Sequence, residues 1–101
     1  MKWRISYSSA AERDIEEAVG SLLQENPEAA ALLVERLYLL EARLAEMPLM
    51  YPVMVRSIRG AWLHPFHYIV YYRMADEAVV VKACLHTSRS PRAIRRVLRQ
   101  R

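Results

Sequence analysis

The run AVVVKACLH, residues 78–86, constrains the fold of this 101-residue chain more than any other segment. It is apolar almost throughout and rich in β-branched valine, as is typical of a strand in a buried, central position of a sheet. Strict alternation along that strand predicts one face made of Val79, Val81, Ala83 and Leu85. The opposite face would then carry Val80, Lys82, Cys84 and His86.

Neighbouring segments supply partners for this strand. HYIVYYR, residues 67–73, is rich in β-branched and aromatic residues and reads as a second strand. Residues 75–77, ADE, form a turn, so the two strands are predicted to pair as an antiparallel hairpin. Residues 53–66 are predicted to be extended, with Gly60 at a turn or bulge, which completes a three-stranded antiparallel sheet.

The amino-terminal part predicts one strand followed by a helix. WRISY, residues 3–7, alternates between apolar and polar side chains, as a half-buried strand does. SAAE, residues 9–12, fits a capping box in which the Ser9 hydroxyl accepts a hydrogen bond from the Glu12 amide. Apolar residues between 11 and 23 then recur at helical spacing, which predicts an amphipathic helix.

Asn26-Pro27 ends this helix and begins another. Proline disfavours helix at the residue before it, yet it suits the first position of a new helix, with Asn26 as the cap. The second helix is predicted to run to about Met47, with Leu33, Leu37 and Leu40 in its core face. Because the connection is so short, the two helices should pack as an antiparallel hairpin.

The order of elements defines the fold class. A strand, two helices and then three strands indicate a single α+β domain over residues 1–101, in which the helical hairpin packs on one face of the sheet. A short basic helix or tail would follow.

Charge divides the chain into two unlike parts. Residues 1–55 carry five Lys or Arg and nine Asp or Glu, whereas residues 56–101 carry ten and two, which gives −4 and +8 and a net charge of +4. Such a split suggests an acidic partner for the basic part, either nucleic acid or an acidic protein segment. A solvated basic tail is the alternative.

Other sequence features exclude several classes of protein. Cys84 is the single cysteine, so neither an internal disulfide nor a zinc-site spacing is present. No secretory signal and no membrane-spanning apolar run is evident. We therefore expect a cytoplasmic protein without a membrane, metal or cofactor requirement.

Five stretches together carry a family resemblance: YSSAAERDIEEAV at 7–19, NPEAAALLVERL at 26–37, LAEMP at 44–48, HYIVYYR at 67–73 and VVVKACLHTSRSP at 79–91. In this order the chain resembles the ParE branch of the RelE/ParE toxins of bacterial type II toxin–antitoxin systems. The resemblance implies a small toxin that a cognate antitoxin wraps and neutralises, in a toxin–antitoxin hetero-oligomer. ParE-branch toxins inhibit DNA gyrase, whereas RelE-branch toxins cleave mRNA on the ribosome.

The first hypothesis is a gyrase inhibitor without chemistry of its own. It binds gyrase and stabilises the cleaved DNA complex, with target contacts from Arg89, Arg92, Arg95 and Arg96. Antitoxin contacts are expected at Leu32, Leu39, Arg56 and Arg59. The structural alternative for the basic tail is a short amphipathic helix that docks through Ile94, Val97 and Leu98 and leaves its charges in water.

The alternative function is a RelE-like, ribosome-dependent and metal-independent mRNA endonuclease. Histidine titrates near neutral pH, so His86 would act as the base, while Arg73 and Arg89 would hold phosphate. A structural role for His86, hydrogen-bonding at the strand exit, is the favoured interpretation. A degenerate, non-toxic member is a third hypothesis, because Thr87 and Ser90 replace the glycine and aspartate usual in this family motif.

Overall fold

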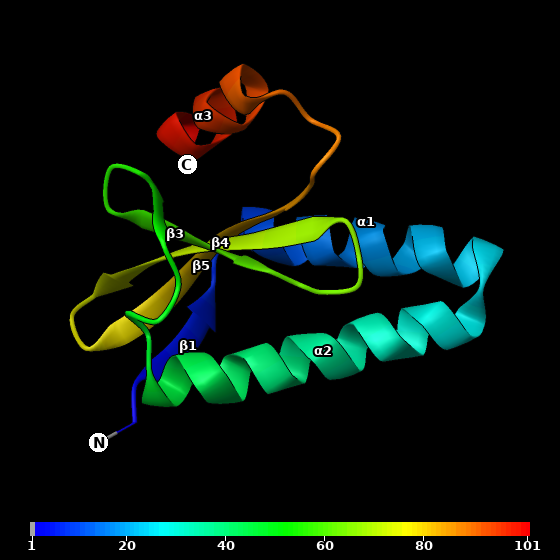
Figure 1. The fold of residues 1–101 in the computed structure, drawn as a ribbon, viewed down its shortest axis with the longest axis horizontal. Helices are drawn as coiled ribbons and strands as arrows, with labels where there is room; N and C mark the ends of the chain where they lie inside the picture. Colours follow the sequence, from blue (N-terminus) through cyan, green and yellow to red (C-terminus); the bar gives the residue numbers. More distant parts are fainter. Residues whose placement is uncertain (1) are drawn as a thin grey trace.

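Three helices flank one five-stranded sheet (Figure 1), over the described residues 2–101 of the computed structural model. The elements are β1 (Arg4–Tyr7), α1 (Ser9–Glu25), α2 (Pro27–Glu46), β2 (Val53–Val55), β3 (Ile58–Trp62), β4 (Tyr68–Ala75), β5 (Ala78–His86) and α3 (Pro91–Gln100). The predicted α+β class is therefore confirmed, as is the order of one strand, two helices, a group of strands and a short carboxy-terminal helix.

The predicted three-stranded antiparallel sheet is wrong in two respects. The strand order is β1-β5-β4-β3-β2, and β1 pairs in parallel with β5, from Arg4 opposite Ala78 to Tyr7 opposite Val81. A half-buried strand needs a partner for its backbone groups, and the outer edge of β5 supplies one. Residues 53–66 also divide into two strands, because the chain reverses at Arg56, whose φ is 54°.

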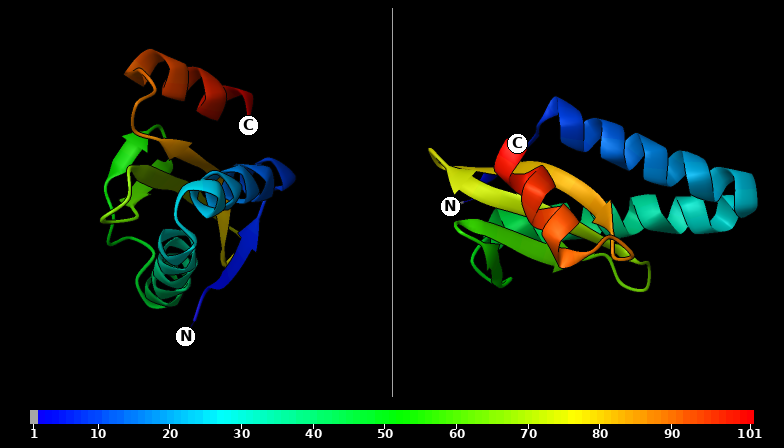
Figure 2. Two further views of the ribbon diagram at one scale, coloured as in Figure 1. Left: turned by 90° about the vertical axis from the view of Figure 1, so that its right-hand side faces the viewer. Right: turned by 90° about the horizontal axis from the view of Figure 1, so that it is seen from above.

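The sheet carries the helical hairpin on one face and α3 on the other (Figure 2). Ala18, Leu33 and Leu44 of the hairpin pack with Val70 and Val81 in the larger core cluster. Across the sheet, a smaller cluster joins Leu98 of α3 to residues that include Ile58, Tyr71, Ala83 and Leu85. The apolar side of the carboxy-terminal helix thus closes a second core layer.

A bulge in β5 changes which side chains share a face. Tyr71 lies opposite Ala83 and Tyr72 opposite Val81, so Lys82 is an extra residue without an opposing partner. The predicted alternation is correct up to Val81 and is reversed beyond Lys82. Cys84 consequently packs with Val79 and Val81 beneath the hairpin, whereas Ala83 and Leu85 contact the α3 cluster.

Two helix caps explain where the hairpin begins and turns. The cap of α1 is Ser8, whose hydroxyl accepts from the Ala11 amide at 3.1 Å, so the predicted Ser9 cap is one residue late. Asn26 serves both helices. Its amide donates to the Leu22 carbonyl, and its side chain accepts from the Glu28 and Ala29 amides. This one-residue link confirms the predicted antiparallel hairpin.

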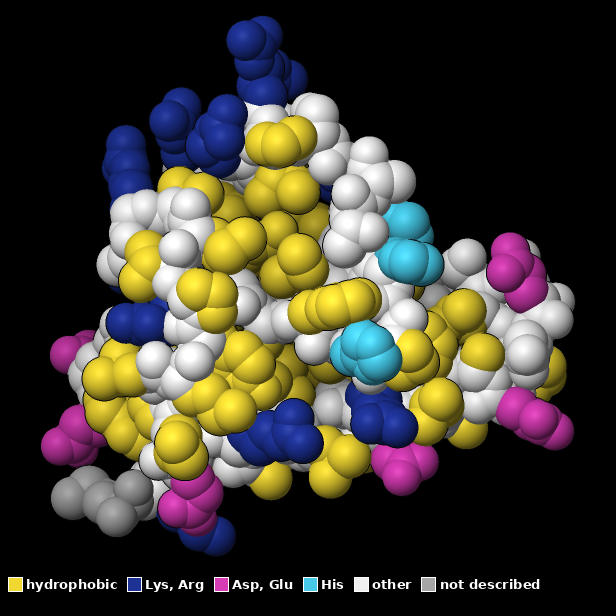
Figure 3. Space-filling view, viewed as in Figure 1, with side chains coloured by type: hydrophobic (Ala, Val, Ile, Leu, Met, Phe, Trp, Pro, Cys, Tyr) yellow, Lys and Arg dark blue, Asp and Glu magenta, His cyan; other side chains and the backbone are white. Residues whose placement is uncertain are grey.

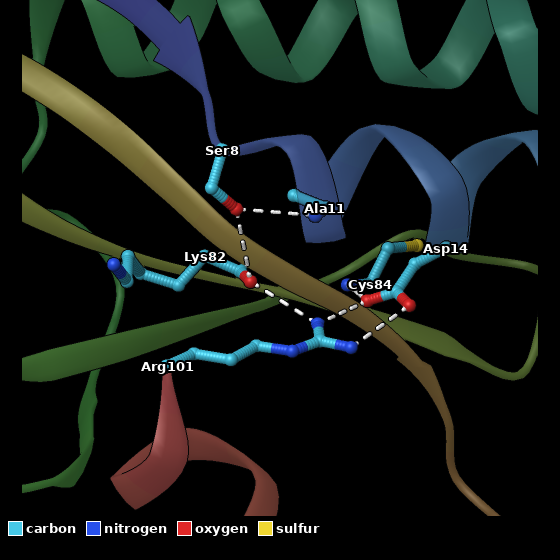
Figure 4. A network of polar contacts seen from close by, with 6 residues as sticks. All are labelled: Ser8, Ala11, Asp14, Lys82, Cys84 and Arg101. Carbon is cyan, nitrogen blue, oxygen red and sulfur yellow. Dashed lines mark hydrogen bonds and ion pairs between the residues drawn. The ribbon is translucent and has the colours of Figure 1, made fainter.

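Beyond the end of β1, side chains instead of a neighbouring strand form hydrogen bonds with the backbone at the edge of β5 (Figure 4). The Asp14 carboxylate of α1 accepts from the Cys84 amide at 3.0 Å, and the Arg101 guanidinium donates to the Lys82 carbonyl at 3.2 Å. Two guanidinium nitrogens of Arg101 also donate to the two carboxylate oxygens of Asp14, at 2.5 and 3.2 Å. One bidentate ion pair therefore joins α1, the β5 bulge and the end of α3.

We predict that the Asp14–Arg101 pair is strongly coupled. Asp14→Ala should lower the free energy of unfolding by about 2–3 kcal/mol, because it leaves the Cys84 amide and a partly buried guanidinium without their acceptor. Arg101→Ala should cost less, and the double variant less than the sum by about 1 kcal/mol or more. Urea unfolding of all four proteins measures this cycle, and strictly additive losses would contradict it.

The two glycines should respond oppositely to alanine. A Cβ at Gly60, inside β3, would lie 2.8 Å from Met54 Cγ and 3.2 Å from Ile69 Cγ2, whereas a Cβ at Gly20 in α1 meets nothing within 4 Å. Gly60→Ala should therefore destabilise by about 1–3 kcal/mol through overpacking. Gly20→Ala should stabilise by about 0.5–1 kcal/mol through helix propensity. Thermal unfolding tests both, and equal shifts would refute the packing argument.

The close approach at Gly60 also corrects its predicted role. Gly60 is neither the turn nor the bulge of this segment; it lies in the strand opposite Tyr71. The absence of a side chain there gives space to its neighbours, and its backbone has no positive φ.

Candidate functional site

The outward side of α3 presents a row of arginines. Ser90 caps the helix by accepting from the Ala93 amide at 3.1 Å, and Pro91 occupies its first turn. Leu98 is buried against the sheet, with Ile94 and Val97 packed around it. This docking fixes the helix about its axis, so the exposed side carries Arg92, Arg95, Arg96 and Arg99, which line one open concavity.

None of these four arginines has an ion-pair partner among the described residues. The ion pairs in that part of the chain are Lys2 with Glu46 and Arg101 with Asp14. Figure 3 shows Lys and Arg side chains gathered at the top of the view, over α3. Unpaired charges of one sign on one face generate a positive surface potential that attracts anionic partners.

The structure places the four predicted target contacts along this end of the chain. It brings Arg92, Arg95 and Arg96 together on α3. Arg89 lies just before the helix, exposed in the turn where its amide donates to the His86 carbonyl at 3.3 Å. These positions form a segment, of which the helical part is the rigid portion.

His86 lies at the end of β5 and closes the turn that follows. Its Nδ1 accepts from the Ser88 amide at 3.0 Å and lies 2.8 Å from the Ser88 hydroxyl. Its ring packs edge-on against Tyr68, with centroids 5.1 Å apart. Because Nδ1 accepts from the Ser88 amide, this nitrogen is engaged within the turn that follows β5.

The residues of the predicted nuclease site do not converge. Tyr68 lies opposite His86, whereas Arg73 lies opposite Val80 at the far end of the same hairpin. Along β4, Arg73 is five residues from Tyr68, the residue opposite His86, which is about 17 Å of strand. The side chains also face opposite sides of the sheet, since His86 contacts Tyr68 on the hairpin side and Arg73 lines a concavity with Leu98 of α3.

The predicted antitoxin contacts fall in different places. Leu39 is 46% exposed and lines a groove between α2 and β3, whereas Leu32 is half-buried and lies outside that groove. Arg56 is exposed at the β2–β3 turn. Arg59 donates to the Leu49 and Tyr51 carbonyls at 3.3 and 2.6 Å, so its guanidinium holds the loop after α2.

The α2–β3 groove contains residues that the sequence interpretation missed. Arg36 and Arg43 join Leu39 along α2, and Tyr51 and Trp62 form the facing wall. Trp62 is 55% exposed, with its indole nitrogen donating to the Phe66 carbonyl. Further exposed apolar side chains follow in the chain after α2: Met47, Leu49, Met50, Val53 and Met54. Apolar residues in a proline-bounded loop were the available sequence signal for this surface.

Titratable groups in the interior have structural roles. Burial, and then the charge of Asp14, raise the pKa of the Cys84 thiol to about 12, so it is not a ready nucleophile. Burial and the hydrogen bond to Glu41 raise the pKa of Tyr7. Within residues 2–101, no cluster of three His, Cys, Asp or Glu could hold a metal ion. Among the helices of residues 2–101, none combines the length and the apolar composition of a membrane span.

Comparison with known proteins agrees with the fold described above. The structure is similar to a solved structure described as the chromosomal ParDE TA system from P. aeruginosa, with a TM-score of 0.74 and 13% sequence identity. The similarity covers 86% of this chain and 98% of the other. No curated protein sequence matches significantly. A family model described as the ParE toxin of the type II toxin–antitoxin system parDE matches residues 5–91. The chain therefore belongs to the ParE family of type II toxin–antitoxin toxins.

Proposed function

We propose that this toxin acts as a binding protein that inhibits DNA gyrase by stabilising its cleaved DNA complex. The observation that supports this proposal is the row of exposed, unpaired arginines on α3. The helix is held against the sheet by its apolar side and by the Arg101–Asp14 ion pair. Gyrase as the target rests on the ParE resemblance. The separation of His86 from Arg73 favours this function over RNA cleavage.

A cognate antitoxin is the second partner in this proposal. The α2–β3 groove combines exposed apolar side chains, Leu39 and Trp62, with two arginines that have no ion-pair partner among the described residues, Arg36 and Arg43. An amphipathic segment with acidic flanks would bury the apolar side chains and neutralise the two arginines. Leu39 is thus the predicted contact that this groove supports best.

The gyrase hypothesis predicts a charge-dependent effect on cleavage. The double variant Arg92→Glu/Arg96→Glu should raise the toxin concentration needed to trap linear DNA from supercoiled plasmid, gyrase and ATP by about tenfold or more, because reversal replaces attraction with repulsion. Arg4→Glu/Arg13→Glu makes the same change in net charge on exposed positions away from α3 and should have little effect.

Two results would count against this mechanism. Equal loss in both double variants would show a response to net charge rather than to α3. If wild-type toxin traps no cleaved DNA, gyrase is not the target. His86→Ala is expected to retain trapping, since that ring closes a turn on the other side of the sheet.

The groove hypothesis is tested with neighbouring residues of α2. Leu39→Asp should weaken binding of the co-purified antitoxin by about tenfold or more, because it places a carboxylate in an apolar contact facing an acidic partner. Tyr38→Asp is the matched control, since Tyr38 is even more exposed, at 67%, but lines a different surface of the hairpin. Titration calorimetry measures both affinities; similar losses would place the antitoxin elsewhere.

A further inference from the structure

A second cationic concavity, of about 180 Å³, lies between α3 and the β2–β3 turn, on the sheet face away from the helical hairpin. Five positively charged residues line it, and no acidic residue does: Arg56, Arg73, Lys82, Arg99 and Arg101. Ser57 adds a hydroxyl. We call this hollow, defined by these six residues, the cationic concavity.

The sheet itself brings two of these charges together. Arg73 of β4 lies opposite Val80 of β5, and Lys82 is two residues further along β5 and points to the α3 side. The two are therefore diagonal neighbours across the strand pair, a separation within reach of long side chains. Arg56, in the left-handed turn, and Arg99, on α3, approach from the rim.

Most of the positive charges in the cationic concavity are not neutralised by acidic side chains of the described residues. Among the lining cations, Arg101 already engages both oxygens of Asp14. Arg56, Arg73, Lys82 and Arg99 have no ion-pair partner within residues 2–101. Like charges held this close destabilise the folded chain, and a bound anion would relieve their repulsion.

The chemistry of the lining selects phosphate. Its polar side chains are guanidinium, ammonium and hydroxyl groups, which donate hydrogen bonds, and guanidinium forks match the oxygens of a phosphate. Arg99 lines both this hollow and the concavity on the outer side of α3, so the two adjoin at this residue. A chain of phosphates, with its regularly spaced charges, fits two adjoining cationic hollows better than an apolar-anchored peptide does.

We infer that the cationic concavity binds a backbone phosphate of DNA, and that the outer arginines of α3 contact phosphates further along the strand. The contact is independent of base sequence, because it uses the backbone alone. This inference goes beyond the proposed function, since docking on gyrase does not require the toxin itself to touch DNA.

The test uses the whole chain and a fluorescent DNA duplex of about 20 base pairs, without gyrase, at about 50–200 mM salt. Fluorescence anisotropy should show binding that weakens steeply with salt. Arg73→Gln/Lys82→Gln should lower affinity by about tenfold and reduce the salt slope by about one to two units. Arg4→Gln/Arg13→Gln removes the same charge elsewhere and should change affinity by less than about threefold.

Further variants and a second probe decide the interpretation. Arg73→Lys should keep most of the affinity, and circular dichroism should show that every variant is folded. No binding by wild type, or equal losses in both double variants, would overturn the inference. Tighter, variant-sensitive binding of a poly-glutamate peptide than of DNA would also overturn it and assign the hollow to an acidic polypeptide. None of these readouts depends on gyrase.

Discussion

The ion pair between Asp14 and Arg101 connects parts of the chain that are otherwise held apart by the sheet. α1 lies on one face and α3 on the other, and this contact passes around the edge of β5 where β1 has ended. It supplies acceptor and donor to backbone groups that lack a strand partner there. The position of the α3 arginines therefore depends on a carboxylate in α1 as well as on the apolar contacts of Leu98 with the sheet.

Local sequence signals predicted the elements well, whereas long-range pairing was not accessible from them. Asn26-Pro27 specifies its own geometry, because a cap and a proline act on adjacent residues. The partner of β1 is some seventy residues away, and nothing in WRISY distinguishes an isolated strand from the parallel edge of a larger sheet. The Lys82 bulge was equally hidden, since one additional residue leaves the composition of the strand unchanged.

Predictions of which site residues lie together were likewise correct where they depended on local spacing and failed where they depended on long-range pairing. Arg92, Arg95 and Arg96 fall within one helix, so their spacing alone places them on one side. The distance from Arg73 to His86 depends on hairpin register, and register sets them at opposite ends. Groove residues such as Arg43 and Trp62 come from separate elements and required the tertiary structure.

The two proposed surfaces lie on different sides of the sheet, and this constrains how neutralisation could work. An antitoxin confined to the α2–β3 groove would leave α3 and the cationic concavity exposed. A segment that continued from the groove past β2 to Arg56, in the turn that lines the concavity, would block them directly. An acidic segment on that path would occupy the phosphate position and neutralise the same cations, so antitoxin and DNA would exclude each other by competing for one set of charges.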